Sequence, residues 1–351
     1  MVAPKRDFFA VVTLFFVAPL VAEYLLGDLP LKLLTALIVL APAYGGGAVL
    51  IRETARRAGR GWPTMLMLGA AYALIGEGLV SQSLFNPDYM NKHWHLLHPA
   101  NIPALGIGGW WTLFMLNLHT FWSMGVSIAL VEALFPAEAE APWLGRVGDT
   151  VVALMFVLGS VASFGIEFKQ NRFVASPAQL LGAAVLSVLL IACAFLIPAR
   201  SSRMAGGGAP SAWIANPWIP GAIAFVLGMG VMKTPYKWGW AAVAAMLALD
   251  AVFLVLVAFF SRQTGWSALH LLSLAAGGAL VYGIHALTAR PLVGGLLGMR
   301  ISSAVFLAAA VWLIGLGARR ILRLQNACFA ARRAHSPNES TTLCAADPPR
   351  P

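Results

Sequence analysis

The sequence predicts an all-α protein, a polytopic bundle of transmembrane helices, and two features of the chain support this. Apolar residues make up 59% of its 351 residues and charged residues 11%, whereas a soluble domain typically has about 45–50% apolar and about 25% charged residues. The apolar residues also fall into runs of about 20, the length that an α-helix needs to cross the hydrocarbon core. We therefore expect a membrane protein whose main partner is the lipid bilayer.

Ten apolar runs are expected to form spans, because a helix satisfies its own backbone polar groups where no water is present. The seventh run holds Pro217, Pro220 and three glycines, a composition that also fits a broken or re-entrant segment and would leave eight or nine spans. The predicted spans are residues 8–26, 31–51, 63–85, 109–135, 149–168, 177–198, 215–232, 238–260, 267–287 and 301–317.

The basic residues predict the orientation of the bundle. Sixteen of the 24 Lys and Arg residues lie at the two termini or in the connections expected on the same side of the membrane as the termini, and eight lie on the other side. Because cytoplasmic connections carry the excess of Lys and Arg, both termini are expected in the cytoplasm. The protein is expected to be a multi-pass protein of the plasma (inner) membrane. The net charge of +10 then reflects topology and contact with anionic lipids, and no nucleic-acid partner is expected.

Three regions are expected along the chain. Residues 1–317 should form the transmembrane bundle, in which a flexible linker at 199–213 divides six spans from four. Residues 318–335 are basic with interspersed apolar residues, as in an amphipathic helix on the cytoplasmic face. Residues 336–351 are polar and Pro-rich, a composition that predicts disorder.

Glu77 and His119 mark the candidate site. Glu77 lies eight residues from the outer end of the third span and His119 ten residues from the outer end of the fourth, which corresponds to depths of about 12 and 15 Å. An ionisable group in a membrane span is costly and is by default a functional-site hypothesis. We expect the two side chains to form a hydrogen-bonded or water-bridged pair, and we take them as the candidate catalytic residues.

Five further polar residues are candidates for substrate binding because of their depth in the spans. Ser81 and Ser123 each lie one helical turn from a member of the pair, whereas Asn117 has a similar depth but faces another way. The three glycines that follow Tyr44 permit close helix approach or a local break. The candidate substrate-binding residues are Tyr44, Ser81, Asn117, Ser123 and Asp250.

Structural interpretations of the same residues stay open. Glu77, His119 and Asp250 also fit side chains that only hydrogen-bond to a neighbouring helix. Glu23, close to the outer end of the first span, is expected at the interface, and Glu132 is expected on the cytoplasmic side, apart from the site.

The outer connection 86–108 is the longest between spans and carries His93, His95, His98 and Asp88. These residues could bind zinc or copper, although their spacing matches no standard metal-binding pattern. A surface cap over the polar site is the favoured role, since connections of this length often act as lids.

One family resemblance involves the same pair. The segment Gly76-Glu77-Gly78-Leu79-Val80-Ser81, followed by Met115 and His119, resembles the CPBP family of CAAX-protease-like intramembrane enzymes. The pattern of that family is EExxxR, then FxxxH, then HxxxN or HxxxD. The resemblance implies that Glu77 activates a water molecule and that His119 orients it or stabilises the developing oxyanion.

The chain departs from the family pattern in three places. Only one glutamate stands in the first motif and no arginine follows it, and Met115 stands where the phenylalanine should be. At the offset of the third motif, His270 is followed by Leu274 and His285 by Ala289.

The leading hypothesis for function is a permease-like protein that handles a small solute or lipid through an outward-facing polar site. The alternatives are a CPBP-like hydrolase and a non-catalytic assembly or scaffold protein. No motif indicates a cofactor, and none is expected. Because proton or substrate relays in transporters use intramembrane carboxylates and histidines, Glu77→Gln should abolish transport or hydrolysis but spare a scaffold.

The predicted orientation can be checked by labelling. An Asn91→Cys variant, in a background without native cysteines, should react with a membrane-impermeant maleimide in intact cells, because residues 86–108 are expected outside. A cysteine in the 199–213 linker serves as the control and should react only after permeabilisation. Labelling of position 91 only after permeabilisation would reject the orientation.

Overall fold

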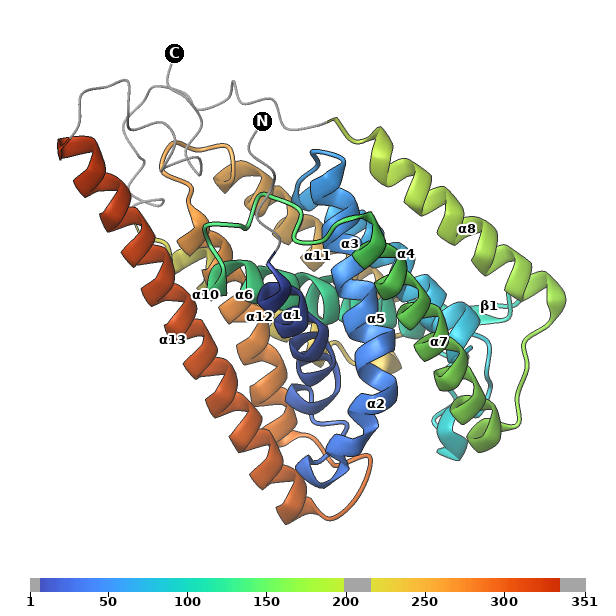
Figure 1. Ribbon diagram of the computed structural model, residues 1–351. Coiled ribbons are helices and arrows are strands. Elements are labelled where there is room, and N and C mark those ends of the chain that lie inside the picture. The colour runs from blue at the N-terminus through green and yellow to red at the C-terminus, as the bar shows by residue number, and fades with distance from the viewer. Residues whose placement is uncertain (1–6, 199–215, 335–351) are drawn as a thin grey trace.

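The computed structural model describes residues 7–198 and 216–334 and shows a bundle of helices (Figure 1). Within these residues nine helices are long and apolar enough to cross a membrane. They are Phe8–Leu25, Leu31–Arg57, Trp62–Val80, Gly109–Leu134, Arg146–Asn171, Pro177–Leu196, Trp240–Phe260, Ala268–Thr288 and Leu296–Ala330. The predicted fold class is confirmed.

Several spans consist of more than one helical segment. The α-helices are α1 (Phe8–Pro19), α2 (Leu37–Leu40), α3 (Gly46–Arg57), α4 (Trp62–Leu74), α5 (Gly109–Asn117), α6 (Ser127–Leu134), α7 (Arg146–Asn171), α8 (Pro177–Leu196), α10 (Ile219–Lys233), α11 (Trp240–Phe260), α12 (Ala268–Thr288) and α13 (Leu296–Ala334). The π-helical segments are η1 (Leu20–Leu25), η3 (Ala41–Gly45), η4 (Ile75–Val80) and η6 (Leu118–Val126). The 3-10 segments are η2 (Leu31–Ala36), η5 (Tyr89–Asn91) and η7 (Tyr236–Trp238), and one short antiparallel pair joins β1 (Asn101–Ile102) to β2 (Ile107–Gly108).

The seventh predicted span, residues 215–232, contains a short unbroken helix and not a broken segment. Helix α10 covers Ile219–Lys233 without a break, and Pro220 lies in its first turn, where no intrahelical hydrogen bond is lost. Its 15 residues span about 22 Å, less than the hydrocarbon thickness of about 30 Å. The interrupted helices lie instead in the first four spans, where the π segments occur.

The basic segment after residue 317 continues the last span. Helix α13 runs as one helix from Leu296 to Ala334, so residues 318–334 share its axis. Their contact with a membrane surface stays a prediction. The 199–213 linker and the tail at 336–351 lie outside the described residues.

The bundle has a buried centre and exposed outer helices. The span Gly109–Leu134 is the most buried, whereas α7, α8 and α11 bury few of their residues. Helix α12 packs on α10 and α13, α4 packs on α8 and η6, and α7 packs on η3. Helices α8 and α13 stand at opposite edges of the bundle (Figure 1). The outer helices leave apolar side chains for lipid.

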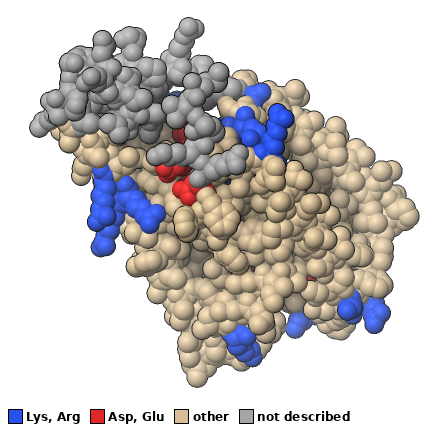
Figure 2. All heavy atoms as spheres, viewed as in Figure 1, with Lys and Arg blue, Asp and Glu red and all other residues tan. Residues whose placement is uncertain are grey.

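The positions of the charged residues also fit a membrane-spanning bundle. In Figure 2, Lys and Arg gather toward the ends of the bundle, and a broad band with almost no charged atoms lies between them. The start of α1 and the end of α13 lie toward the same end of the bundle (Figure 1). This agrees with an even number of crossings, which the nine longer helices give only together with α10 as a tenth. Which side of the membrane that end faces stays a prediction.

Glycines allow the second span to pack closely against its neighbours. A Cβ added at Gly45 would collide with the backbone carbonyl of Phe15, and one at Gly47 would collide with the ring of Tyr72. The expected close approach after Tyr44 is therefore present. It brings the backbones of α1 and η3 into contact.

This packing makes a testable prediction. Gly45→Ala should lower the free energy of unfolding by about 1–3 kcal/mol, because the new methyl group meets rigid backbone. Gly165→Ala is the matched control, since its Cβ would meet no atom within 4 Å and alanine favours a helix. Thermal unfolding in detergent measures both, and equal stability of the two variants would contradict the packing argument.

Candidate functional site

The structure brings Glu77 and His119 into direct contact. Glu77 lies in η4 and His119 in η6, and the Nε2 atom of His119 is 2.8 Å from the Oε1 atom of Glu77. Both residues are buried, with 6% of their surface exposed. The predicted hydrogen-bonded pair is confirmed. It joins the third and fourth spans inside the bundle.

The second carboxylate oxygen of Glu77 is also satisfied. The hydroxyl of Ser81 donates to Oε2 at 2.9 Å, and the hydroxyl of Ser83 donates to the same atom. The indole N–H of Trp111 donates in turn to the Ser83 hydroxyl at 3.2 Å. Ser81 is one of the residues predicted from the sequence, whereas Ser83 and Trp111 are not. Their spacing gave no signal, because Ser83 lies beyond the end of η4, where the chain no longer follows a helical repeat.

The other ring nitrogen of His119 is open. Its Nδ1 atom is buried and has no hydrogen-bond partner among the described residues. The rings of Tyr44 and Tyr72 lie beside the imidazole, with centroid distances of 5.8 and 6.1 Å. Since a buried polar atom costs free energy unless it is bonded, this nitrogen is suited to bind a proton, a water molecule or a ligand.

A second carboxylate belongs to the same cluster. The Glu23 carboxyl lies near the Tyr44 hydroxyl, and it is close enough to His119 and Glu77 to interact electrostatically. The expectation that Glu23 lies apart at the interface was wrong. The first span turns into η1, which packs against η6, and this contact directs Glu23 inward.

The connection after η1 adds one more acid. Desolvation raises the pKa of Asp28 well above its usual range, and the nearby negative charge of Glu23 raises it further. A carboxyl group with a raised pKa holds a proton at higher pH than an exposed one. The titratable groups thus extend from this connection into the bundle.

All four central residues of this cluster lie on π-helical segments. These are Glu23 on η1, Tyr44 on η3, Glu77 on η4 and His119 on η6. A π turn is rare and occurs frequently at functional sites. The sequence explains these π turns. Pro19 lies just before η1 and Pro42 lies within η3, and each lacks a backbone N–H donor. Two glycines flank Glu77.

The remaining predicted residues do not join the pair. The side-chain amide of Asn117 donates to the Oδ2 atom of Asp250 on α11 at 3.0 Å, so Asn117 and His119 make their contacts on different faces, as expected. The Ser123 hydroxyl donates to the backbone carbonyl of Leu118 at 3.3 Å. Ser123 therefore supports the π segment that carries His119, and a role for it in substrate binding stays a prediction.

A separate buried ionic cluster lies where α3 ends. The Arg56 guanidinium binds both carboxylate oxygens of Glu132, at 2.8–3.0 Å, and Arg52 donates to Glu132 at 3.2 Å and to Glu53 at 2.6 Å. Arg52 is fully buried and lies 3.4 Å over the ring of Trp143. The expectation that Glu132 is separate from the site is confirmed.

The same cluster holds the connection after α6. Arg52 donates to the carbonyls of Glu138 and Ala139, and the backbone N–H groups of Trp143 and Leu144 donate to Glu53 at 2.9 Å each. Sequence reasoning counted the arginines for orientation and missed this cluster. The signal was the spacing of Arg52 and Arg56 by one helical turn at the end of a span.

The 86–108 connection shows no metal site. His93 pairs with Asp88 at 2.9 Å, and the rings of His95 and His98 stack on each other. No group of three His, Cys, Asp or Glu residues in the described chain is arranged to hold a metal ion.

The fold and the buried cluster define the class of this protein, a multi-pass helical membrane protein with an intramembrane carboxylate and imidazole pair. A family model described as "Uncharacterized membrane protein family" matches residues 12–333, and the chain belongs to that family. No curated protein and no solved structure matches the chain. The comparisons give no support to the CPBP resemblance.

The ionic cluster makes a prediction about stability. Glu132→Ala should lower the free energy of unfolding by about 3–5 kcal/mol, because two buried arginines lose their shared carboxylate. Glu140→Ala is the matched control: its exposed carboxylate also binds Arg56, at 2.5 Å, and its loss should cost less than about 1 kcal/mol. Unfolding by SDS titration measures both changes. A small effect of Glu132→Ala would show that the cluster does not hold the connection.

Proposed function

We propose that this protein is a proton-linked permease for a small solute or lipid, with the Glu77 and His119 pair as its proton-carrying group. One observation carries the proposal: the two side chains share a buried hydrogen bond of 2.8 Å while the second nitrogen of His119 has no partner among the described residues. Intramembrane carboxylates and histidines form the proton relays of many transporters.

The chemistry of the pair suits proton binding. Imidazole and carboxylate groups both bind and release protons, and here one of each shares a buried hydrogen bond. Tyr44, Glu23 and Asp28 add three more titratable groups between the pair and the connection after η1. These groups offer a series of proton sites leading to His119.

Proton binding at this pair is coupled to helix contacts. A proton on the Glu77 carboxyl would remove one acceptor from a set of hydrogen bonds that ties η4 to η6 and to the Ser83 hydroxyl. Both segments are π-helical, and their irregular hydrogen bonding makes a local change of register less costly than in a regular helix. A local change in charge is a common trigger of such rearrangements.

Hydrolysis is the second candidate function, and the same contact favours it. A carboxylate that activates water next to an imidazole is a general-base arrangement, and Glu23 places a second carboxyl group in the same cluster. A scaffold role is the third candidate and needs only the hydrogen bonds.

Proton flux distinguishes these functions. Purified protein in liposomes that contain a pH-sensitive dye is given an inward proton gradient and a panel of solutes: amino acids, sugars, organic acids and lysolipids. At least one class should accelerate proton entry into liposomes with the wild-type protein. Glu77→Gln and His119→Gln should reduce this flux by about tenfold or more, because each removes a proton site.

Glu138→Gln is the control for these variants, because it makes the same chemical change outside the spans. It should keep the wild-type flux. Cleavage of a quenched fluorescent transmembrane peptide by the wild-type protein, lost in Glu77→Gln, would favour hydrolysis instead. Wild-type flux in the Glu77→Gln liposomes would contradict the permease proposal.

A further inference from the structure

Asp250 is a carboxylate without a cation. It lies on α11, half-buried, and the side-chain amide of Asn117 holds its Oδ2 atom at 3.0 Å. None of the ion pairs within the described chain includes it. A charged side chain in a membrane span is normally paired or faces a cavity. The residues around Asp250 therefore indicate which kind of cation could pair with it.

Asp250 lines an apolar cavity. The cavity has a volume of about 130 Å³ and lies between η6, α10, α11 and α12, with Phe121, Trp122 and Phe253 among its walls. Gly228 and Gly278 also line it, and because neither has a side chain, α10 and α12 pack closely against the ring of Trp122. A dry apolar cavity of roughly 150 Å³ binds benzene, so a benzene-sized group matches this space.

A second observation points to a ligand at the same place. The indole N–H of Trp122 is buried and has no acceptor among the described residues, although only 5% of this residue is exposed. Buried indole N–H groups usually find a partner. A ligand that places an oxygen atom or a π face against this N–H would satisfy it.

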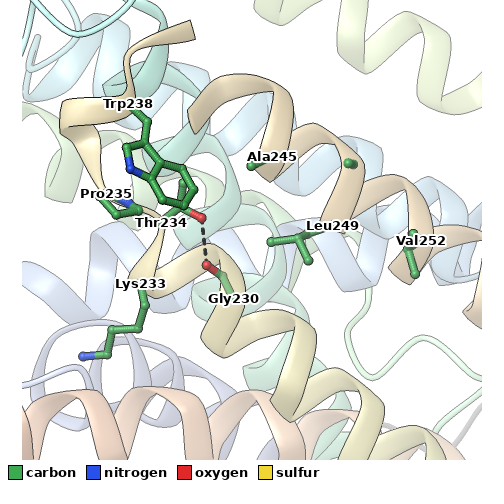
Figure 3. A pocket seen from close by; sticks show the side chains of 9 residues that line it. Gly230, Lys233, Thr234, Pro235, Trp238, Ala245, Leu249 and Val252 are labelled. Carbon is green, nitrogen blue, oxygen red and sulfur yellow. Dashed lines mark hydrogen bonds between the residues drawn. The ribbon is translucent and has the colours of Figure 1, made fainter. Parts of the chain in front are cut away.

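A larger hollow adjoins the cavity and shares Leu249 with it. The hollow has a volume of about 420 Å³ and lies between the end of α10 and the start of α11 (Figure 3). Among the described residues, Lys233 is the one basic side chain in its lining, and it points away from Leu249 in this view. The Lys233 amine lies 3.4 Å from the His285 ring and 3.5 Å from the Thr288 hydroxyl. It therefore does not neutralise Asp250.

We propose that the cavity at Asp250 binds a lipophilic organic ammonium ion, with its cation against the Asp250 carboxylate and its apolar body among the aromatic walls. The carboxylate supplies the counter-charge, the Asn117 amide fixes its orientation, and the rings attract a cation through their π faces. The apolar lining selects against small hydrated cations, which would lose their water without replacement.

The proposal does not depend on the permease function, because it concerns equilibrium binding at a site apart from Glu77. Benzyltrimethylammonium is a suitable probe: it joins a benzene ring to a permanent cation whose charge does not change with pH. The protein is placed in nanodiscs of zwitterionic lipid, so that the lipid surface does not attract the cation, and binding of radiolabelled probe is measured against empty nanodiscs.

The wild-type protein should bind the probe in a saturable manner. Asp250→Asn should weaken binding by about tenfold or more, because it keeps the shape and the contact with Asn117 but removes the charge. Glu167→Gln is the matched control and should bind as the wild type does: Glu167 is another half-buried carboxylate in a span, held by the Asn171 amide at 2.8 Å.

Two further measurements keep the test independent of folding. Leu254→Trp, which adds volume to the cavity lining while leaving Asp250 unchanged, should also weaken binding. The neutral isostere neopentylbenzene should compete weakly with the probe. Saturable binding that Asp250→Asn leaves unchanged, equal competition by the neutral isostere, or no binding above that of empty nanodiscs would each overturn the proposal.

Discussion

The cost of burying a polar group without a partner governs the arrangement of this bundle. Helices meet that cost for the backbone, and each ionisable side chain inside the bundle must meet it by contact with another span. The hydrogen bond between Glu77 and His119 is the central case, because it joins the third and fourth spans where the structure is most buried. The neighbouring side chains of Ser81, Ser83 and Trp111 complete the same network.

Two buried clusters use this constraint in different ways. Around Arg52 and Arg56 every charge has a close partner, and the cluster fixes a connection to the end of α3. Around His119 one ring nitrogen is left unpaired within the described chain. A cluster in which every polar group has a partner stabilises the fold, whereas a buried polar atom without a partner is available to bind a proton or a ligand. This difference is why the proposed function rests on Glu77 and His119 and not on the larger ionic cluster.

The π-helical segments explain how four spans deliver side chains to one point. A regular helix repeats every 3.6 residues, and the wider π turn shifts the faces that follow it. The segments η1, η3, η4 and η6 carry Glu23, Tyr44, Glu77 and His119. Close contact at Gly45 brings η3 against α1, and side-chain contacts join the irregular segments: the Tyr44 ring lies beside His119, and His119 binds Glu77.

The sequence alone determined the fold class, the approximate positions of nine of the ten predicted spans and the matched depth of Glu77 and His119, because hydropathy and helical rise set depth in a membrane. The tertiary structure decided which of the polar side chains meet one another, because depth alone does not determine this. Which way a side chain faces depends on the local register and on the neighbouring helix. For this reason Glu23 joined the site against expectation, Asn117 met Asp250, and Arg52 found Glu132 80 residues along the chain.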